Sequence, residues 1–258
     1  MKTVFSMIAL AGLALTAWSQ TPLKINTYSG TPVERYDGQQ CDVTADRYLF
    51  NGWNTISLPF AMTEQEIDEA LGHGVRLERL VGVTQQGADI VLNFQDCKAQ
   101  GLQANTPYIL YYPGETGTKK LQVNTRVESK ESRVTMTTGG GVEVTFGGAA
   151  VKTDAKHLYG IRVIDNLDAK FTYIDNDKAL FYATRCFISI PGEQHYNLTV
   201  NHLAPGELTS INEIAAADDI VDVYNVLGMR VAQGVTVSEV NNLAAGIYVV
   251  KGRKIIVK

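Results

Sequence analysis

The chain has few of the residues, and none of the short motifs, that usually carry enzymatic chemistry. Its 258 residues include only four histidines and three cysteines. No Gly-x-Ser-x-Gly elbow, P-loop, His-Glu-x-x-His helix or Cys-x-x-Cys pair occurs in it. The glycines at 139–141 predict a hairpin turn, because a phosphate-binding loop would need a helix to follow. The sequence therefore predicts a protein that is not an enzyme and holds no cofactor.

Long hydrophobic runs are also missing beyond the N-terminal segment. In that segment a positive charge at Lys2 precedes an apolar run over residues 4–17, which is too short to span a membrane. Small residues at positions 17 and 19 predict cleavage between Ser19 and Gln20. We interpret residues 1–19 as a secretory signal peptide. The mature chain is expected to be secreted or displayed on the outer-membrane surface, soluble and without a transmembrane segment.

An excess of basic residues is absent as well. The whole chain has 23 basic and 27 acidic residues. Residues 20–219 contain 17 basic and 25 acidic residues, whereas residues 220–258 contain five and two. An acidic body does not attract nucleic acid or anionic lipid by general electrostatics. We therefore expect no nucleic-acid partner.

Cysteine is too scarce to form a disulfide framework. Cys41, Cys97 and Cys186 are an odd set, so one disulfide with one free thiol is one interpretation. Three buried free thiols are the other, because cysteine also behaves as a small hydrophobic residue. A nucleophilic Cys97 or Cys186 would need a partner histidine, and no sequence pattern links such a pair. We interpret both as core thiols.

What the sequence has in abundance is short apolar–polar alternation broken by turn residues, which predicts strands. Asn51-Gly52 between two β-forming runs predicts a hairpin. A capping box at Thr63 and Glu66 predicts one short helix. Further strands are expected at 75–83, 89–97, 107–112, 134–138, 142–146, 158–164, 171–174, 180–182 and 186–190. Residues 20–203 are thus predicted to form an all-β body, an antiparallel β-sandwich or jelly-roll-like fold.

The composition changes near residue 204. Residues 204–219 are rich in Pro, Gly, Ser, Asn and Ala and are interpreted as a linker. A Lys251-Gly252 turn is expected between the last two of five strands, which lie at 220–226, 229–231, 235–240, 247–250 and 254–257. Residues 220–258 are therefore predicted to form a small Ig-like β-sandwich of their own.

This tail resembles the C-terminal sorting domain of the type IX secretion system, the outer-membrane export route of the Bacteroidota. The resemblance lies in three runs, at 221–231, 243–250 and 251–258. Their matching residues are Tyr224, Gly228, Leu243, Gly246, Ile247, Tyr248, Lys251, Gly252 and Lys254. Members of that family are small β-sandwiches that direct export and are often removed afterwards. The resemblance implies that the tail binds the export machinery, and it leaves open whether the tail is cleaved.

The body is similar to a β module of surface proteins in the same phylum. The similarity is carried by residues 52–60, Gly-Trp-Asn-Thr-Ile-Ser-Leu-Pro-Phe, followed by the capped helix. Weaker matches lie at 106–110 and 181–187. No chemistry is established for that module, so the resemblance implies an architecture and a location and supplies no site residues.

Two groups of polar residues resemble metal ligands. His195 and His202 are close in sequence, but a good site needs at least three convergent ligands, so surface histidines are the preferred interpretation. Asp165, Asp168 and residues 175–177 could bind a structural calcium ion, yet the segment lacks the later Gly and Glu of an EF-hand loop. A turn explains 175–177 better, because Asp and Asn favour turns. We predict no metal site.

Aromatic residues are the remaining indication of a binding surface. A platform for a sugar or for a partner's side chains could include Trp53, Tyr108, Tyr111, Tyr112, Tyr173 and Tyr182. Core packing is the competing interpretation, and it is preferred for Trp53. Tyr111 and Tyr112 are adjacent on one strand, so one of the two should face outward. These two tyrosines are our candidate binding residues.

The sequence as a whole favours an exported, non-enzymatic, adhesin-like binding module with a glycan or a protein as its ligand. A structural component of the envelope or of a filament is the alternative, and self-association through strand edges would be its mark. A small hydrolase ranks last. Carboxylates are plentiful enough for a glycosidase pair, but a small sandwich offers loops or a sheet face in place of a cleft. The identity of the ligand and the oligomeric state are left open.

Overall fold

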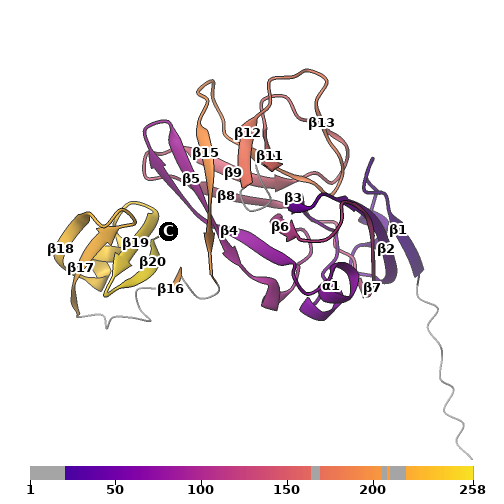
Figure 1. The fold of residues 1–258 in the computed structure, drawn as a ribbon, viewed down its shortest axis with the longest axis horizontal. Helices are drawn as coiled ribbons and strands as arrows, with labels where there is room; N and C mark the ends of the chain where they lie inside the picture. Colours follow the sequence, from indigo (N-terminus) through magenta and orange to yellow (C-terminus); the bar gives the residue numbers. More distant parts are fainter. Residues whose placement is uncertain (1–20, 164–168, 205–207, 210–218, 258) are drawn as a thin grey trace, which may run out of the picture.

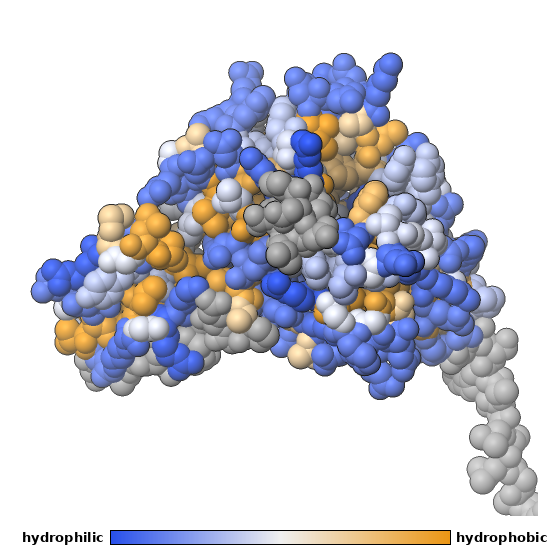
Figure 2. Space-filling model, in the orientation of Figure 1, coloured by the Kyte–Doolittle hydropathy of each residue, from blue (hydrophilic) through white to orange (hydrophobic). Residues whose placement is uncertain are grey.

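The computed structural model describes residues 21–163, 169–204, 208–209 and 219–257. Within these ranges the chain is mostly β, with a large body and a smaller C-terminal tail beside it (Figure 1). The body surface is largely hydrophilic, and apolar side chains gather on the tail (Figure 2). The predicted cleavage point between Ser19 and Gln20 lies outside the described residues.

The body consists of two main sheets. The smaller sheet has the strand order β1 (Thr21–Ile25), β2 (Gln40–Leu49) and β7 (Gly117–Arg126). The larger, curled sheet has the order β3 (Gly52–Ile56), β6 (Tyr108–Tyr112), β4 (Arg76–Gln86), β5 (Asp89–Asp96), β15 (Asn197–Leu203), β12 (Ala169–Tyr173), β11 (Tyr159–Val163), β14 (Cys186–Ser189), β9 (Glu143–Gly148) and β8 (Arg133–Thr137). β10 (Thr153–Asp154) pairs separately with β13 (Leu180–Phe181). The predicted all-β, sandwich-like fold is confirmed.

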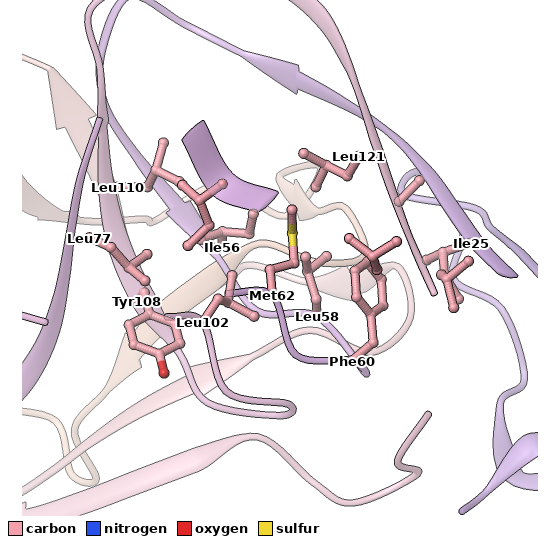
Figure 3. Close-up of a cluster of buried hydrophobic side chains, with 14 of the residues drawn as sticks. Ile25, Ile56, Leu58, Phe60, Met62, Leu77, Leu102, Tyr108, Leu110 and Leu121 are labelled. Atoms are coloured by element: carbon pink, nitrogen blue, oxygen red, sulfur yellow. The ribbon is translucent and has the colours of Figure 1, made fainter. Parts of the chain in front are cut away.

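One hydrophobic core lies between the two sheets. Alternate residues of β2 are buried, including Val43 and Leu49, because successive side chains of a strand point to opposite faces. Across from them, β6 contributes Tyr108 and Leu110 to the same cluster, which Figure 3 shows at close range. Each such side chain contributes about 1.5–3 kcal/mol when it leaves water.

A second core fills the inside of the curled sheet. Phe94, Phe146 and Phe171 meet there, with ring centroids 5.3 Å apart for the first two and 6.0 Å apart for the last two. Both contacts are edge-to-face, the arrangement that the ring quadrupoles favour. β6 therefore lies between two cores, and both of its faces are covered.

The predicted helix is confirmed as α1 (Glu64–Leu71). The Thr63 hydroxyl accepts from the Glu66 backbone N–H, and the Glu66 carboxylate accepts from the Thr63 backbone N–H, which completes the capping box. Ile67 is its buried residue and joins the core between the sheets. Gly72, with a φ of 94°, ends the helix.

The hairpin predicted at Asn51-Gly52 is wrong. β2 pairs with β1 and β7, whereas β3 pairs with β6, so the chain crosses from one sheet to the other at this point. Of the two residues only Gly52 has a positive φ, of 95°. The Asn51 side chain donates to the carbonyls of Pro113 and Gly114, both at 3.0 Å, which ties the crossover to the loop after β6.

The two body sheets also contain parallel pairings that alternation along the chain does not reveal. β1 runs parallel to β2, and β15 runs parallel to β5. Neither β1, β7 nor β15 was predicted as a strand. By contrast, the hairpin predicted at glycines 139–141 is confirmed as β8–β9, and the strands predicted at 75–83 and 89–97 pair as β4 and β5.

The tail strands belong to one sheet, in the order β16 (Leu208–Thr209), β20 (Arg253–Val257), β19 (Gly246–Val250), β17 (Ile220–Asn225) and β18 (Arg230–Thr236). The region predicted as an Ig-like sandwich thus supplies four strands of a five-stranded sheet and a helix that packs on it. β16 falls in the predicted linker, most of which lies outside the described residues. The turn at Lys251 (φ 48°) and Gly252 (φ 75°) is confirmed.

The strand predicted at 235–240 is partly wrong. β18 ends at Thr236, and α3 (Val237–Asn241) follows. Thr236 and Glu239 form a second capping box, and Val237 and Val240, three residues apart, both turn toward the tail core. The segment is helical because the capping box and the helical spacing of the two valines outweigh the β propensity of valine.

The tail packs on the outer face of β4. A Cβ placed on Gly82 would lie 3.2 Å from Cδ1 of Ile256 and 3.7 Å from Cγ1 of Ile247. These two isoleucines of β20 and β19 therefore pack on β4 at Gly82, where β4 has no side chain. In the part of the chain that the structure describes, no helix has the length and apolar character needed to cross a bilayer.

Candidate functional site

The aromatic residues considered as a platform do not share one surface. Trp53, Tyr108 and Tyr112 are buried, with exposed fractions of 1%, 2% and 4%. The suggestion that Tyr112 contacts a ligand is therefore wrong, because its ring belongs to the core between the sheets. Tyr111 is half-buried, and its ring packs on Trp53 with 5.4 Å between centroids. Neither tyrosine faces outward, because both faces of β6 are covered.

Other aromatic pairs are exposed, among them Tyr48 with Phe50 and Tyr28 with Tyr182, and the rings of the second pair stack. Tyr28, in the loop after β1, is 54% exposed, and Tyr182, directly after β13, is 37% exposed. Their rings stack with centroids 4.3 Å apart. Lys152 Nζ lies 4.9 Å from the Tyr28 centroid and 5.9 Å from the Tyr182 centroid. We call Tyr28, Tyr182 and Lys152 the tyrosine shelf.

Backbone hydrogen bonds hold the loop that carries Tyr28. Asn26 Oδ1 accepts from the backbone N–H of Tyr28 (2.9 Å) and from that of the next residue (3.0 Å), an Asx turn. The Tyr28 carbonyl accepts from the Ala183 N–H at 3.2 Å. A Cβ on Gly30 would lie 2.5 Å from the Ala150 carbonyl oxygen, so the loop needs glycine there. The shelf is therefore fixed by the chain rather than by its rings alone.

The shelf has an apolar face and a polar edge. The pKa of Tyr28 lies below its ordinary value, chiefly because the Tyr182 hydroxyl donates to it and further because Lys152 lies close. Lys152 Nζ is 3.5 Å from the Tyr28 hydroxyl. A cation near an aromatic face is itself attracted to the ring. This arrangement suits a ligand that is apolar on one face and polar at its rim.

A cavity of about 160 Å³ lies beside the shelf. Shelf residues directly adjoin its wall, since Lys152 follows Val151 and Tyr182 precedes Ala183. Ile25 and Leu58, both buried, contribute an apolar part of the lining. The polar lining residues are Thr31, Glu34, Ser57, Asn105, Ser129, Lys130, Ser132 and Thr184.

Thr184 adopts a backbone conformation that β-branched residues rarely take. Its φ is 68°, which costs on the order of 1–3 kcal/mol. Its N–H donates to the Ala149 carbonyl (2.8 Å), and its carbonyl accepts from the Ser57 N–H (3.0 Å). Its side chain is 4% exposed, and the hydroxyl has no hydrogen-bond partner among the described residues. Strain and an unpaired buried hydroxyl at one residue are typical of functional sites.

Two serine hydroxyls face each other in the same wall. Ser57 Oγ and Ser132 Oγ are 2.6 Å apart, and either can donate to the other. A hydroxyl pair of this kind keeps one proton and several lone pairs for a further partner. Gly148 leaves them room, because a Cβ there would lie 2.6 Å from Ser57 Cβ and 2.9 Å from Ser132 Oγ. The wall is thus shaped around the two hydroxyls.

Part of this site was visible in the sequence. The run at residues 52–60, which carries the resemblance to surface-protein modules, contains Ser57, Leu58 and Pro59, and all three line the cavity. Tyr182 was among the aromatic residues considered. Tyr28 and Lys152 were missed. The Asn26-to-Gly30 turn signal places Tyr28 in a loop, and that signal would have been the way to find it.

The two histidines considered as metal ligands have different surroundings. His195 is exposed. His202 Nδ1 lies 2.6 Å from Glu78 Oε2, and its ring stacks on Trp53 with centroids 4.3 Å apart. Glu78 is fully buried and also pairs with Arg76. His202 therefore belongs to a hydrogen-bonded cluster around the buried Glu78, and the interpretation as a surface histidine is wrong for it.

The aspartates considered for calcium form a turn. Asn176 Oδ1 accepts from the Lys178 N–H at 2.9 Å, and Asp177 pairs with Lys156. Asp165 and Asp168 lie outside the described residues. Across residues 21–163, 169–204, 208–209 and 219–257, no three His, Cys, Asp or Glu side chains gather as a metal-binding group.

The cysteines are free and buried, which decides between the two interpretations left open. Burial raises the pKa of Cys97 and of Cys186 to about 12 and also raises the pKa of Cys41. Because the thiolate is the reactive form, these thiols are unreactive at neutral pH.

The residues that carry the tail resemblance have mostly structural positions. Ile247 is buried, Leu243 packs on the tail core, and Gly228 has a φ of 80° in the turn after β17. The half-buried members are Tyr224, Tyr248 and Lys254, and the turn or strand-end members are Gly246, Lys251 and Gly252. Close to them, large apolar residues are exposed at Ile220, Val226, Leu227, Met229 and Val231.

Comparisons of the chain with protein-family models, with curated proteins and with solved structures give no match. The site is therefore interpreted from its own geometry.

Proposed function

We propose that the chain is an exported, non-enzymatic, adhesin-like protein whose body binds a glycan or protein ligand on the tyrosine shelf. The observation that carries the proposal is the exposure of two stacked rings that the backbone holds in place. Tyr28 and Tyr182 lie outside the two main cores, so their burial is left for a partner. Aromatic residues in fixed positions are common anchors of binding surfaces, since little side-chain entropy is lost on binding.

The tail is proposed to direct export to the cell surface. Three exposed apolar residues support this, with exposed fractions of 51% for Val226, 65% for Leu227 and 55% for Met229. They lie on the turn that joins β17 to β18. β18 is the last strand of the tail sheet in the described residues, so its outer edge is available for pairing. Exposed apolar surface of this kind marks contact with another protein.

Binding of the purified mature chain to a glycan and host-protein array tests the first proposal. A specific ligand should lose most of its affinity when Tyr28 and Tyr182 are both replaced by Ala. Tyr48→Ala is the matched control, because Tyr48 is 44% exposed and also lies beside another ring, that of Phe50. A ligand whose binding is equally weakened by the control, or is unchanged in the shelf variant, would contradict the proposal.

Surface display in the native host tests the role of the tail. The double substitution Leu227→Ser, Met229→Ser should abolish display and leave the fold intact, because both side chains are exposed. Leu180→Ser is the control, an exposed leucine of the body (46%). Normal display of the double variant would speak against recognition at this turn.

A further inference from the structure

We infer that the cavity beside the tyrosine shelf is a subsite for one neutral pyranose ring at the end of a glycan chain. The next sugar of that chain then stacks on Tyr28 and Tyr182. The inference rests on the proposed binding function and adds to it the chemical class and the orientation of the ligand.

The size of the cavity matches one six-membered ring. Its volume is about 160 Å³, far more than the roughly 15 Å³ needed to hold a single water. A cavity of about 150 Å³ is known to take one six-membered carbon ring. One pyranose therefore fills the space, and a second must remain outside.

The polar groups of the wall suit sugar hydroxyls. Ser57, Ser132 and Thr184 each present a hydroxyl, which donates one hydrogen bond and accepts two. The first two already form a pair at 2.6 Å, and Thr184 Oγ1 has no partner in the described chain. A sugar hydroxyl has the same dual character, so it can extend the serine pair, and a rotation of the buried Thr184 hydroxyl toward the cavity would give that hydroxyl the partner it lacks.

The charge of the wall favours a neutral sugar. Two charged residues line the cavity, Glu34 and Lys130, one of each sign, and both are exposed. Lys152 on the rim is already engaged by the rings and the hydroxyl of the shelf. The described wall thus has no excess of cations to pair with a uronate or a sulfate.

The lining also determines which part of a glycan enters. Ile25 and Leu58 are buried core residues that close the inner side, so a chain cannot continue through the cavity. Tyr182 and Lys152 are the chain neighbours of the lining residues Ala183 and Val151, so an exposed aromatic face lies next to the cavity. A terminal ring therefore enters first, and its neighbour meets the shelf.

Calorimetric titration of the full mature chain tests the inference. The probes are gluco-, galacto- and manno-configured tetrasaccharides, each in free form and with the hydroxyls of its non-reducing end methylated, together with the methyl pyranosides and the corresponding uronates. One free tetrasaccharide should bind, its end-methylated form should bind at least 10-fold more weakly, and the uronate should gain nothing.

Three substitutions distinguish the contribution of the cavity to binding from that of the shelf. Ser132→Ala and Thr184→Val should each weaken the tetrasaccharide about 10-fold by removing one hydroxyl, whereas Tyr182→Ala should also abolish stacking of the second ring. Ser29→Ala is the control, an exposed serine of the shelf loop that does not line the cavity. Thermal unfolding of each variant confirms that it is folded.

The possible outcomes distinguish failure of the subsite from failure of the proposed binding function. A tetrasaccharide that needs Tyr182 but tolerates Ser132→Ala, Thr184→Val and end methylation would overturn the subsite and leave the shelf as the binding surface. Preference for the uronate would overturn the neutral assignment. If no saccharide binds and a protein ligand requires the shelf, the subsite is refuted while the proposed function stands. If nothing depends on the shelf, both are refuted.

Discussion

Replacing Glu78 by leucine should destabilise the chain by about 3–5 kcal/mol, the usual consequence of removing one partner from a buried ion pair. The Glu78 carboxylate is fully buried, and its Oε2 lies 2.6 Å from His202 Nδ1. Its other oxygen bonds Arg76, whose side chain is 45% exposed. The two partners therefore respond differently when the carboxylate is removed.

The structure places most of the cost at the histidine. Arg76 can turn toward water, so its loss of a partner costs little. The His202 side chain is only 20% exposed, and its Nε2 is already buried without a partner among the described residues. In the Glu78→Leu variant both ring nitrogens are left unpaired, at about 1–3 kcal/mol for each such group. Together with the misfit of the shorter, branched leucine side chain, this gives the expected range.

A double variant separates this explanation from a simple packing defect. Glu78→Leu combined with His202→Phe removes the unpaired nitrogens and keeps an aromatic ring against Trp53. In the wild type the centroids of the Trp53 and His202 rings are 4.3 Å apart. Its stability should return to within about 1.5 kcal/mol of the wild type, because a well-packed apolar replacement of an ion pair is often neutral.

Urea unfolding followed by tryptophan fluorescence is the assay. Trp53 is the single tryptophan of residues 20–258, so the signal arises at the substituted cluster itself. A Glu78→Leu variant within 1 kcal/mol of the wild type would refute the reasoning. So would a double variant that is as unstable as the single one, since the cost would then lie in the packing of the leucine and not in the unpaired nitrogens.

Three further outcomes are expected. Thr184→Gly should raise the free energy of unfolding by about 1 kcal/mol in thermal or urea denaturation, because glycine accepts a φ of 68° without strain; a loss of stability would contradict the strain argument. Cys186 should not react with a thiol reagent in the folded chain and should react fully in urea, since its pKa is about 12 and it is buried; rapid labelling at pH 7 would show that the region opens. The pKa of Asp68 lies below its ordinary value because Lys98, at 2.5 Å, and then His73 stabilise the carboxylate. Asp68 therefore stabilises the fold at pH values above the ordinary aspartate pKa. This contribution is lost as the pH falls through the lowered pKa. Asp68→Asn should therefore flatten the acid limb of the stability–pH curve, and an unchanged limb would show that other carboxylates dominate it.

Elements set by nearby residues were predictable from the sequence. The capping box at Thr63 and Glu66 and the turn at Lys251-Gly252 depend on groups only a few residues apart, and both are present. The same rules applied at Thr236 and Glu239 would have predicted α3, but the valines there were interpreted by their β propensity. A local pattern predicts an element reliably only when it is compared with the other patterns in the same segment, here the capping box with the β propensity of valine.

Features set by distant residues could not be predicted in this way. The Asn51-Gly52 turn has a hairpin composition, yet its flanking strands find partners elsewhere, in β7 and β6. Tyr112 is buried because a second sheet covers β6, which no pattern within β6 reveals. The cavity combines loops from Thr31 to Thr184, so its hydroxyls converge only in the folded chain.

The parallel pairing of β5 with β15 has a consequence for the timing of folding. Residues 108 positions apart meet in it, for example Ile90 and Leu198, and no hairpin can bring them together early. The chain must lose the entropy of closing this long loop before any contact between the two strands stabilises it, so sheets of this topology form slowly. The large sheet cannot be completed until residue 203 has been synthesised. On the export route proposed above, this delay would keep the emerging chain extended during its passage across the inner membrane and postpone assembly of the cavity until the far side is reached.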